Sequence, residues 1–176
     1  MSTLKVDTIQ TTGGVTLLSD PEANYVLDQW RLNANFTSHG NTLTGWERPD
    51  HATHGRIGTG MTESSGIFTF PSTGLYMVTV QAMMLVAAND GAVGVDLKIS
   101  TDSGSSTSAI ASAYEGDTSS SDSNETAYAS ALINVTNTST FQVSLLAISI
   151  ASGSAIIGDS DNNYTTITFE RKGPSQ

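Results

Sequence analysis

The sequence feature that most constrains the fold is a continuous apolar run between residues 75 and 86. At the two-residue period of a β-strand, one face of this run carries Tyr76, Val78, Val80, Ala82 and Met84. The other face is also largely apolar, with Leu75, Met77 and Met83. A strand that is apolar on both faces is covered on both sides. We therefore predict that one face packs on an opposing sheet and that the other meets a loop or a second subunit.

The rest of the chain after residue 30 also alternates with the period of strands. Residues 93–99 alternate strictly, residues 126–135 and 141–148 are joined by a tight turn, and the β-branched and aromatic segment 164–169 closes the series. Turn-forming clusters of Gly, Asn, Asp and Ser separate these runs. Many short strands with frequent turns predict an all-β jelly-roll sandwich without helical layers.

The N-terminal segment has a different pattern. Two short apolar alternations flank the turn Gly13-Gly14, and they carry Leu4, Val6, Ile9, Val15 and Leu17. Two strands of this length bury too little surface to be stable alone, so we predict an extended arm that anchors on another surface. The chain then divides into an N-terminal arm region, residues 1–29, and a jelly-roll domain, residues 30–176.

One short helix is compatible with the sequence at the end of the arm region. Asp20 is a suitable N-cap and Pro21 a suitable first helical residue, and the helix would carry Tyr25, Val26 and Trp30. The sequence alone does not decide between this helix and an extended segment.

Charge and cysteine content exclude several classes of partner. The chain has 17 acidic and 7 basic side chains, for a formal net charge of -10. Because an acidic surface repels phosphate backbones and anionic lipid, we expect neither nucleic acid nor a membrane as a partner. The absence of cysteine excludes disulfides and thiolate metal sites. The first residues lack the apolar run of a signal peptide, so we expect folding in a cytoplasm.

No catalytic motif is present, and we predict that the protein is not an enzyme. There is no Gly-x-Ser-x-Gly turn, and Gly58-Thr59-Gly60 lacks the third glycine of a nucleotide-binding loop. His51 and His54 are spaced for neither a triad nor a complete zinc site. A hydrolase is the weakest alternative, and variants of these two histidines would test it.

One acidic turn has the spacing of calcium ligands. Asp159 and Asp161, followed by Glu170, match part of the EF-hand pattern, but Tyr164 stands where that loop needs glycine. We therefore reject an EF-hand and leave open a simpler calcium site at Asp159 and Asp161. No other cofactor is expected.

The segment from Gly66 to Tyr76 reads Gly-Ile-Phe-Thr-Phe-Pro-Ser-Thr-Gly-Leu-Tyr. It resembles the G-x-F-x-x-P-x-x-G-x-Y signature of the complement globular-head family, a group of tumour necrosis factor-like jelly rolls. In it, Pro71 and Gly74 favour a tight turn, and Phe68 and Tyr76 supply aromatic bulk to one core. The resemblance extends over about residues 30–171. It departs from the family in lacking a collagen-like segment, cysteine and the usual glycine of the final strand, which argues against a secreted animal protein.

The resemblance implies a homotrimer packed on aromatic and aliphatic residues near its axis. By analogy, the residues expected at that interface are Tyr76, Val78, Val80, Met84, Ile167 and Phe169.

The opening Ser2-Thr3-Leu4-Lys5-Val6-Asp7-Thr8-Ile9-Gln10 is similar to the start of virion structural proteins of tailed bacteriophages, especially those of marine and cyanobacterial hosts. This similarity implies assembly in a bacterial cytoplasm and location in the virion. We expect a trimeric capsid decoration (cement) protein or short head fibre, with the arm bound to the major capsid protein or another virion protein. The alternative is a receptor-binding tail fibre or tip, which would recognise a host surface glycan or protein through loops 102–108, 115–124 and 159–163.

Overall fold

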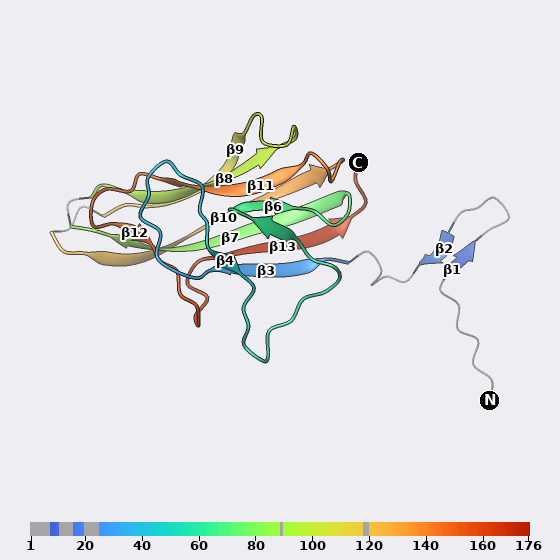
Figure 1. The fold of residues 1–176 in the computed structure, drawn as a ribbon, viewed down its shortest axis with the longest axis horizontal. Helices are drawn as coiled ribbons and strands as arrows, with labels where there is room; N and C mark the ends of the chain where they lie inside the picture. The colour runs from blue at the N-terminus through green and yellow to red at the C-terminus, as the bar shows by residue number, and fades with distance from the viewer. Residues whose placement is uncertain (1–7, 11–15, 20–24, 89, 118–119) are drawn as a thin grey trace.

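A computed structural model describes residues 8–10, 16–19, 25–88, 90–117 and 120–176 (Figure 1). Within these ranges every regular element is a β-strand, and the strands pair only in the antiparallel sense. The same ranges contain no helix that is long and apolar enough to cross a membrane. The prediction of an all-β sandwich is confirmed.

One layer of the sandwich is a six-stranded sheet with the order β10-β7-β13-β3-β4, in which β12 also pairs with β7. Its strands are β3 (Leu27–Leu32), β4 (Trp46–Glu47), β7 (Gly74–Val86), β10 (Ser123–Val135), β12 (Ala155–Ile156) and β13 (Thr166–Gly173).

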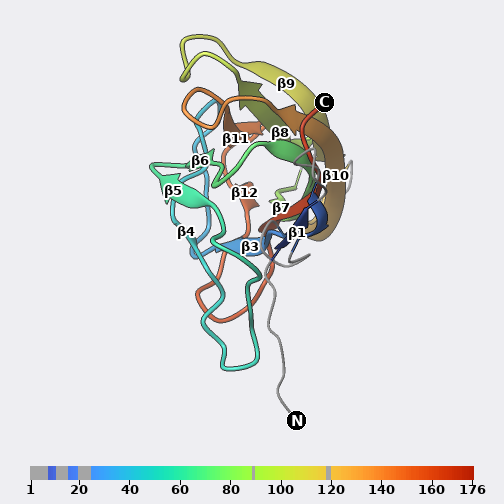
Figure 2. The same ribbon diagram turned by 90° about the vertical axis from the view of Figure 1, so that its right-hand side faces the viewer.

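The other layer is a five-stranded sheet with the order β5-β6-β11-β8-β9. Its strands are β5 (Thr62–Ser64), β6 (Ile67–Thr69), β8 (Val93–Ser100), β9 (Ser108–Glu115) and β11 (Gln142–Ile148). Figure 2 shows the two sheets facing each other across the core.

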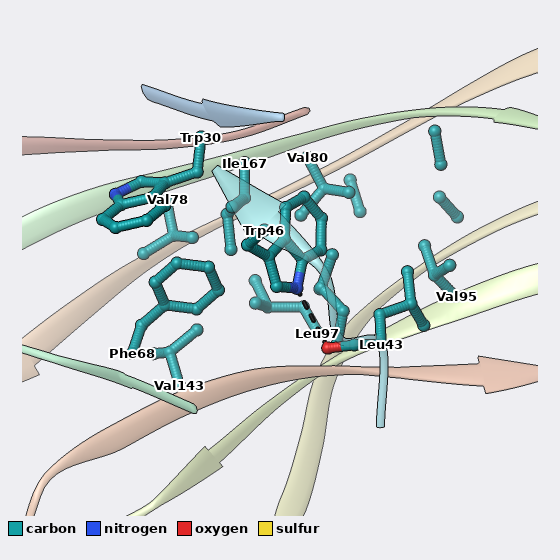
Figure 3. Packing of buried hydrophobic residues seen from close by; sticks show 14 of the residues in the cluster. Trp30, Leu43, Trp46, Phe68, Val78, Val80, Val95, Leu97, Val143 and Ile167 are labelled. Carbon is teal, nitrogen blue, oxygen red and sulfur yellow. Dashed lines mark hydrogen bonds between the residues drawn. The ribbon is translucent and has the colours of Figure 1, made fainter. Parts of the chain in front are cut away.

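The centre of the core is an aromatic cluster around Phe68, which is fully buried. The ring of Phe68 lies 5.6 Å from that of Trp30, 5.7 Å from that of Trp46 and 5.1 Å from that of Phe169. Figure 3 shows how Val78 and Ile167 of one sheet and Val143 of the other pack near these rings. Edge-to-face contacts between large rings stabilise the pairing of segments that are distant in sequence.

The expected trimer interface is wrong as a set of residues, because the structure buries all of them inside the subunit. None has any exposed surface: Tyr76, Val78, Val80, Met84, Ile167 and Phe169. These side chains face the opposing sheet, so they cannot face a partner. Alternation separates the two faces of a strand but does not say which one points inward, and both faces of β7 are apolar.

The Gly66–Tyr76 segment connects the two layers. It leaves β6 in the five-stranded sheet and enters β7 in the six-stranded sheet. A Cβ at Gly74 would lie 2.7 Å from the backbone oxygen of Gly173, so only glycine fits this approach. The Tyr76 hydroxyl donates to the Ser72 carbonyl at 3.0 Å and secures the crossing. Phe68 and Tyr76 both enter the core, as the sequence predicts.

The tight turn at residues 136–140 also crosses between layers. It joins β10, which pairs with β7, to β11, which pairs with β6 and β8.

The possible helix is wrong where it can be checked, since residues 27–32 form strand β3, which pairs with β13. Residues 20–24 lie outside the described residues. Asp28, Trp30 and Leu32 alternate into the interior, and this two-residue period selects a strand. The first strand of the sandwich thus begins at Leu27, before the boundary expected at residue 30.

The N-terminal arm region contains a separate two-stranded sheet. Strand β1 (Thr8–Gln10) pairs with β2 (Thr16–Ser19). Ile9 and Leu17 belong to these strands, whereas Leu4, Val6 and Val15 lie outside the described residues. Two short strands are present as expected, and the anchoring role stays a prediction.

Candidate functional site

The outer face of the six-stranded sheet carries an apolar strip over β7 and β10. In the ladder of these strands Met77 is opposite Leu132 and Gln81 is opposite Tyr128. Tyr128 is 66% exposed and Leu132 is 57% exposed, the highest values among the large apolar side chains that the structure describes. The polar pair Thr79 and Ser130 lies between these two positions, so the exposed apolar side chains gather on one face without being continuous. Apolar side chains gathered on one exposed face mark a candidate interaction surface.

The outward residues of β7 extend this strip. Leu75, Met77 and Met83 are only partly buried, in contrast to the fully buried residues between them. We call the group Leu75, Met77, Met83, Tyr128 and Leu132 the outer-sheet patch. Tyr128 and Leu132 are not covered by any of the loops that the structure describes.

A chain of hydrogen bonds crosses the sheet beside the patch. The Tyr128 hydroxyl donates to Gln81 Oε1 at 3.3 Å, and Gln81 Nε2 donates to the Asn163 carbonyl at 3.3 Å. Asn163 Nδ2 donates to Gln29 Oε1 at 3.3 Å, and Gln29 Nε2 donates to Thr168 Oγ1 at 3.1 Å. These bonds orient neutral polar groups around the apolar strip, as at the rim of a protein interface.

The histidine loop packs against the acidic turn at this margin. Asn163 Nδ2 lies 3.1 Å from His54 Nε2, and the rings of His51 and His54 are 6.3 Å apart. The His51 ring accepts the Thr53 amide at Nδ1. Within the part of the chain that the structure describes, no three His, Cys, Asp or Glu side chains are grouped to hold a metal ion.

Asp159, the first possible calcium ligand, is occupied by its own turn. Its Oδ1 accepts the amides of Asp161 and Asn162, each at 2.7 Å. These bonds hold the pKa of the Asp159 carboxyl below its usual value. The structure brings no third acidic or histidine side chain to Asp159 and Asp161 among the described residues.

The three loops suggested for receptor contact do not form one surface. In the β8–β9 ladder Val93 is opposite Glu115 and Ile99 is opposite Ser108. Loop 102–108 and loop 115–124 therefore lie at opposite ends of this pair of strands.

The serine-rich loop after β8 is organised by Asp102. Its Oδ1 accepts Ser100 Oγ at 2.8 Å and the Ser106 amide at 2.9 Å, and its Oδ2 accepts Ser106 Oγ at 2.6 Å. These bonds, chiefly those from Ser106, lower the pKa of Asp102 to about 2. The loop is ordered despite its composition because one carboxylate bonds several of its polar groups.

Acid should loosen this loop. Because the folded pKa of about 2 lies below the usual 3.8, the contribution of Asp102 is complete above pH 3.8 and is lost as pH falls towards 2. Asp102→Asn should produce the same loosening at neutral pH, seen as faster hydrogen exchange at the amides of Gly104 and Ser106. Asp96→Asn is the matched control on β8 and should leave those amides unchanged. Equal exchange in both variants would contradict this role.

A buried carboxylate that sequence reasoning missed ties the loop before β5 to β3. Asp28, 1% exposed, accepts Arg48 Nε and Nη2, each at 2.9 Å, the Trp30 indole at 3.0 Å and the Met61 amide at 2.7 Å. The Arg48 guanidinium also lies 4.1 Å from the centre of the Trp30 ring. The bidentate ion pair and the stacking of Arg48 on Trp30 together hold the segment that leads to His51 and His54 against strand β3.

Comparison with known proteins identifies the fold. No protein-family model matches the sequence, and no curated protein matches it significantly. Among solved structures, the Eiger TNF of S. frugiperda has a TM-score of 0.64 at 12% identity, over 86% of this chain and 95% of that one. Murine APRIL has a TM-score of 0.62 at 15% identity, over 84% of this chain and 99% of that one. At these identities the likeness shows the fold alone, a tumour necrosis factor-like jelly roll.

Proposed function

We propose that this chain is a non-catalytic virion structural protein of a tailed bacteriophage, a homotrimer that decorates the capsid or forms a short head fibre. The observation that carries the proposal is the combination of an N-terminal hairpin in its own sheet with a sandwich whose apolar outer-sheet patch is uncovered. The similarity of Ser2–Gln10 to phage structural proteins supports the virion location.

The partner that suits the outer-sheet patch is a second copy of the chain. The net charge of -10 makes most surfaces of two copies repel each other. The five residues of the patch are uncharged, and the Glu170 carboxylate that lies opposite Met77 is paired with Lys172 at 2.6 Å. Contact between the patch of one copy and the β10 edge of the next is heterologous, and three such contacts close a ring. The amide groups beside the patch would form its polar rim.

The position at which the arm region joins the sandwich supports attachment of such a trimer by one end. It leads into β3 at Leu27, which lies opposite Glu170 at the Met77 end of the sheet. The loops after β7 and before β10 lie at the other end, since Val86 is opposite Ser123. Addition of an arm strand to a sheet edge of the major capsid protein or another virion protein would hold each subunit. Three arms would then act together by avidity.

The experiment that tests this function is quantitative mass spectrometry of purified particles of the source phage. Hundreds of copies per particle would identify a capsid decoration protein, and a few to a few dozen would identify a fibre. Deletion of residues 1–18 should leave the trimer intact, by light scattering, and abolish attachment to particles. Absence from purified particles, or attachment without residues 1–18, would contradict the proposal.

A further inference from the structure

A hollow of about 250 Å³ lies on the outer face of the five-stranded sheet, the layer opposite the outer-sheet patch. Its polar lining includes Lys98 from β8, Gln142 and Ser144 from β11, and Thr107 from the loop before β9. Ile67 and Leu146 add partly buried apolar surface. An assembly built on the six-stranded sheet would leave this hollow open.

Lys98 stands at an irregular point of the sheet. It is opposite Ser144 on one side and Ala109 on the other, whereas Leu97 is opposite Ala111, so Ile110 is an extra residue in β9. Bulges of this kind redirect side chains and are frequent next to binding sites. Lys98 is partly buried, and its ammonium has no hydrogen-bond or ion-pair partner among the described residues.

The neutral polar groups beside Lys98 are also unpaired. Within the described chain, neither the Ser144 hydroxyl nor the Gln142 side-chain amide has a hydrogen-bond partner. The two carboxylates nearest in sequence are engaged elsewhere, Asp96 with Ser112 Oγ at 2.6 Å and Asp102 within its own loop. The hollow therefore offers one cation, a hydroxyl and an amide without competing internal bonds.

We infer that this hollow binds an acidic saccharide, with Lys98 pairing with its carboxylate or sulfate group. Ser144 and Gln142 are suited to the sugar hydroxyls, because a hydroxyl and an amide both donate and accept hydrogen bonds. Ile67 and Leu146 are suited to the apolar C–H face of the ring. This activity goes beyond the proposed structural role and does not depend on it, because the hollow is complete within one subunit.

Calorimetric titration of the full-length protein tests this site. The probes are a galacturonate trisaccharide, a sulfated galactose trisaccharide, a neutral galactose trisaccharide and sodium sulfate. We expect at least one acidic saccharide to bind about tenfold or more tightly than both the neutral saccharide and free sulfate, as for a hydrogen bond to a charged group. The two acidic probes distinguish a carboxylate from a sulfate ligand, and either result supports the inference.

Lys98→Gln should weaken binding of the acidic saccharide by about tenfold or more. Gln142→Ala, which keeps the charge, should weaken it severalfold. The control is Lys172→Gln, which removes the same charge from a lysine paired with Glu170 at 2.6 Å and should leave binding unchanged. Absence of binding by both acidic probes, equal binding of the neutral saccharide, or equal affinities in Lys98→Gln and Lys172→Gln would overturn the inference.

Discussion

Replacing Tyr128 and Leu132 together by aspartate should convert the proposed trimer into folded monomers. Both side chains are mostly exposed in the isolated subunit, at 66% and 57%, so the change leaves the core intact. Between subunits the same positions would lose water, and an unpaired carboxylate costs several kcal/mol when it is desolvated, to order of magnitude. We expect the mass in solution to fall from three times 18.4 kDa to 18.4 kDa, with an unchanged circular dichroism spectrum.

The matched control for this variant is Tyr114→Asp. Tyr114 is 51% exposed on β9 of the five-stranded sheet, where its ring lies over Gly94 of the neighbouring strand β8. This change adds a carboxylate at an exposed aromatic position outside the outer-sheet patch, and the protein should stay trimeric. A double variant that remains trimeric would place the interface elsewhere, and a monomeric parent protein would refute the trimer itself.

Asp28→Ala should lower the free energy of unfolding by about 3 kcal/mol or more, as for other buried ion pairs that lose one partner. The substitution leaves the Trp30 indole and the Met61 amide without their acceptor, and it removes both bonds to Arg48. Water can partly compensate at Arg48, whose side chain is 35% exposed, so we expect the lower end of the usual range. Urea denaturation at one fixed protein concentration measures the change.

Two variants separate the buried charge from a general effect of losing a carboxylate. Asp96→Ala removes a partly exposed group that accepts one bond, from Ser112, and should change stability by less than about 0.5 kcal/mol. Asp28→Asn retains an acceptor for one N–H but loses the ion pair. Its free energy of unfolding should therefore lie between those of Asp28→Ala and Asp96→Ala. Equal stability of Asp28→Ala and Asp96→Ala would show that the buried network contributes nothing.

Strand β9 shows where sequence patterns are weak. Its residues Ser108–Glu115 include three alanines and two serines, which have little preference for strands, and the sequence pattern predicts no strand between residues 99 and 126. The strand forms because β8 supplies a partner along its length, with Val95 opposite Ala113 at the core face. Tertiary pairing overrides propensity here.

The outer-sheet patch shows a different limit. The sequence indicates that both faces of β7 are largely apolar, and its Gly66–Tyr76 segment indicates the jelly roll; the cover of the outer face stays a prediction. The choice of inward face depends on register with β10 and β13, and a shift of one residue would reverse it. The residues of β7 that were predicted for the trimer interface therefore lie on the face that packs in the core.

By itself the sequence determined the strand class, the main strands, the tight turn at Pro71 and Gly74, and the separate N-terminal hairpin. These follow from alternation and turn chemistry, which are properties of neighbouring residues. Only the tertiary structure decided that Asp28 is buried with Arg48, that Tyr128 and Leu132 lie outside, and that Lys98 meets Ser144 and Gln142. Each of these depends on side chains that distant segments bring together, and the free energy of such contacts is set by packing and solvent exclusion rather than by local pattern.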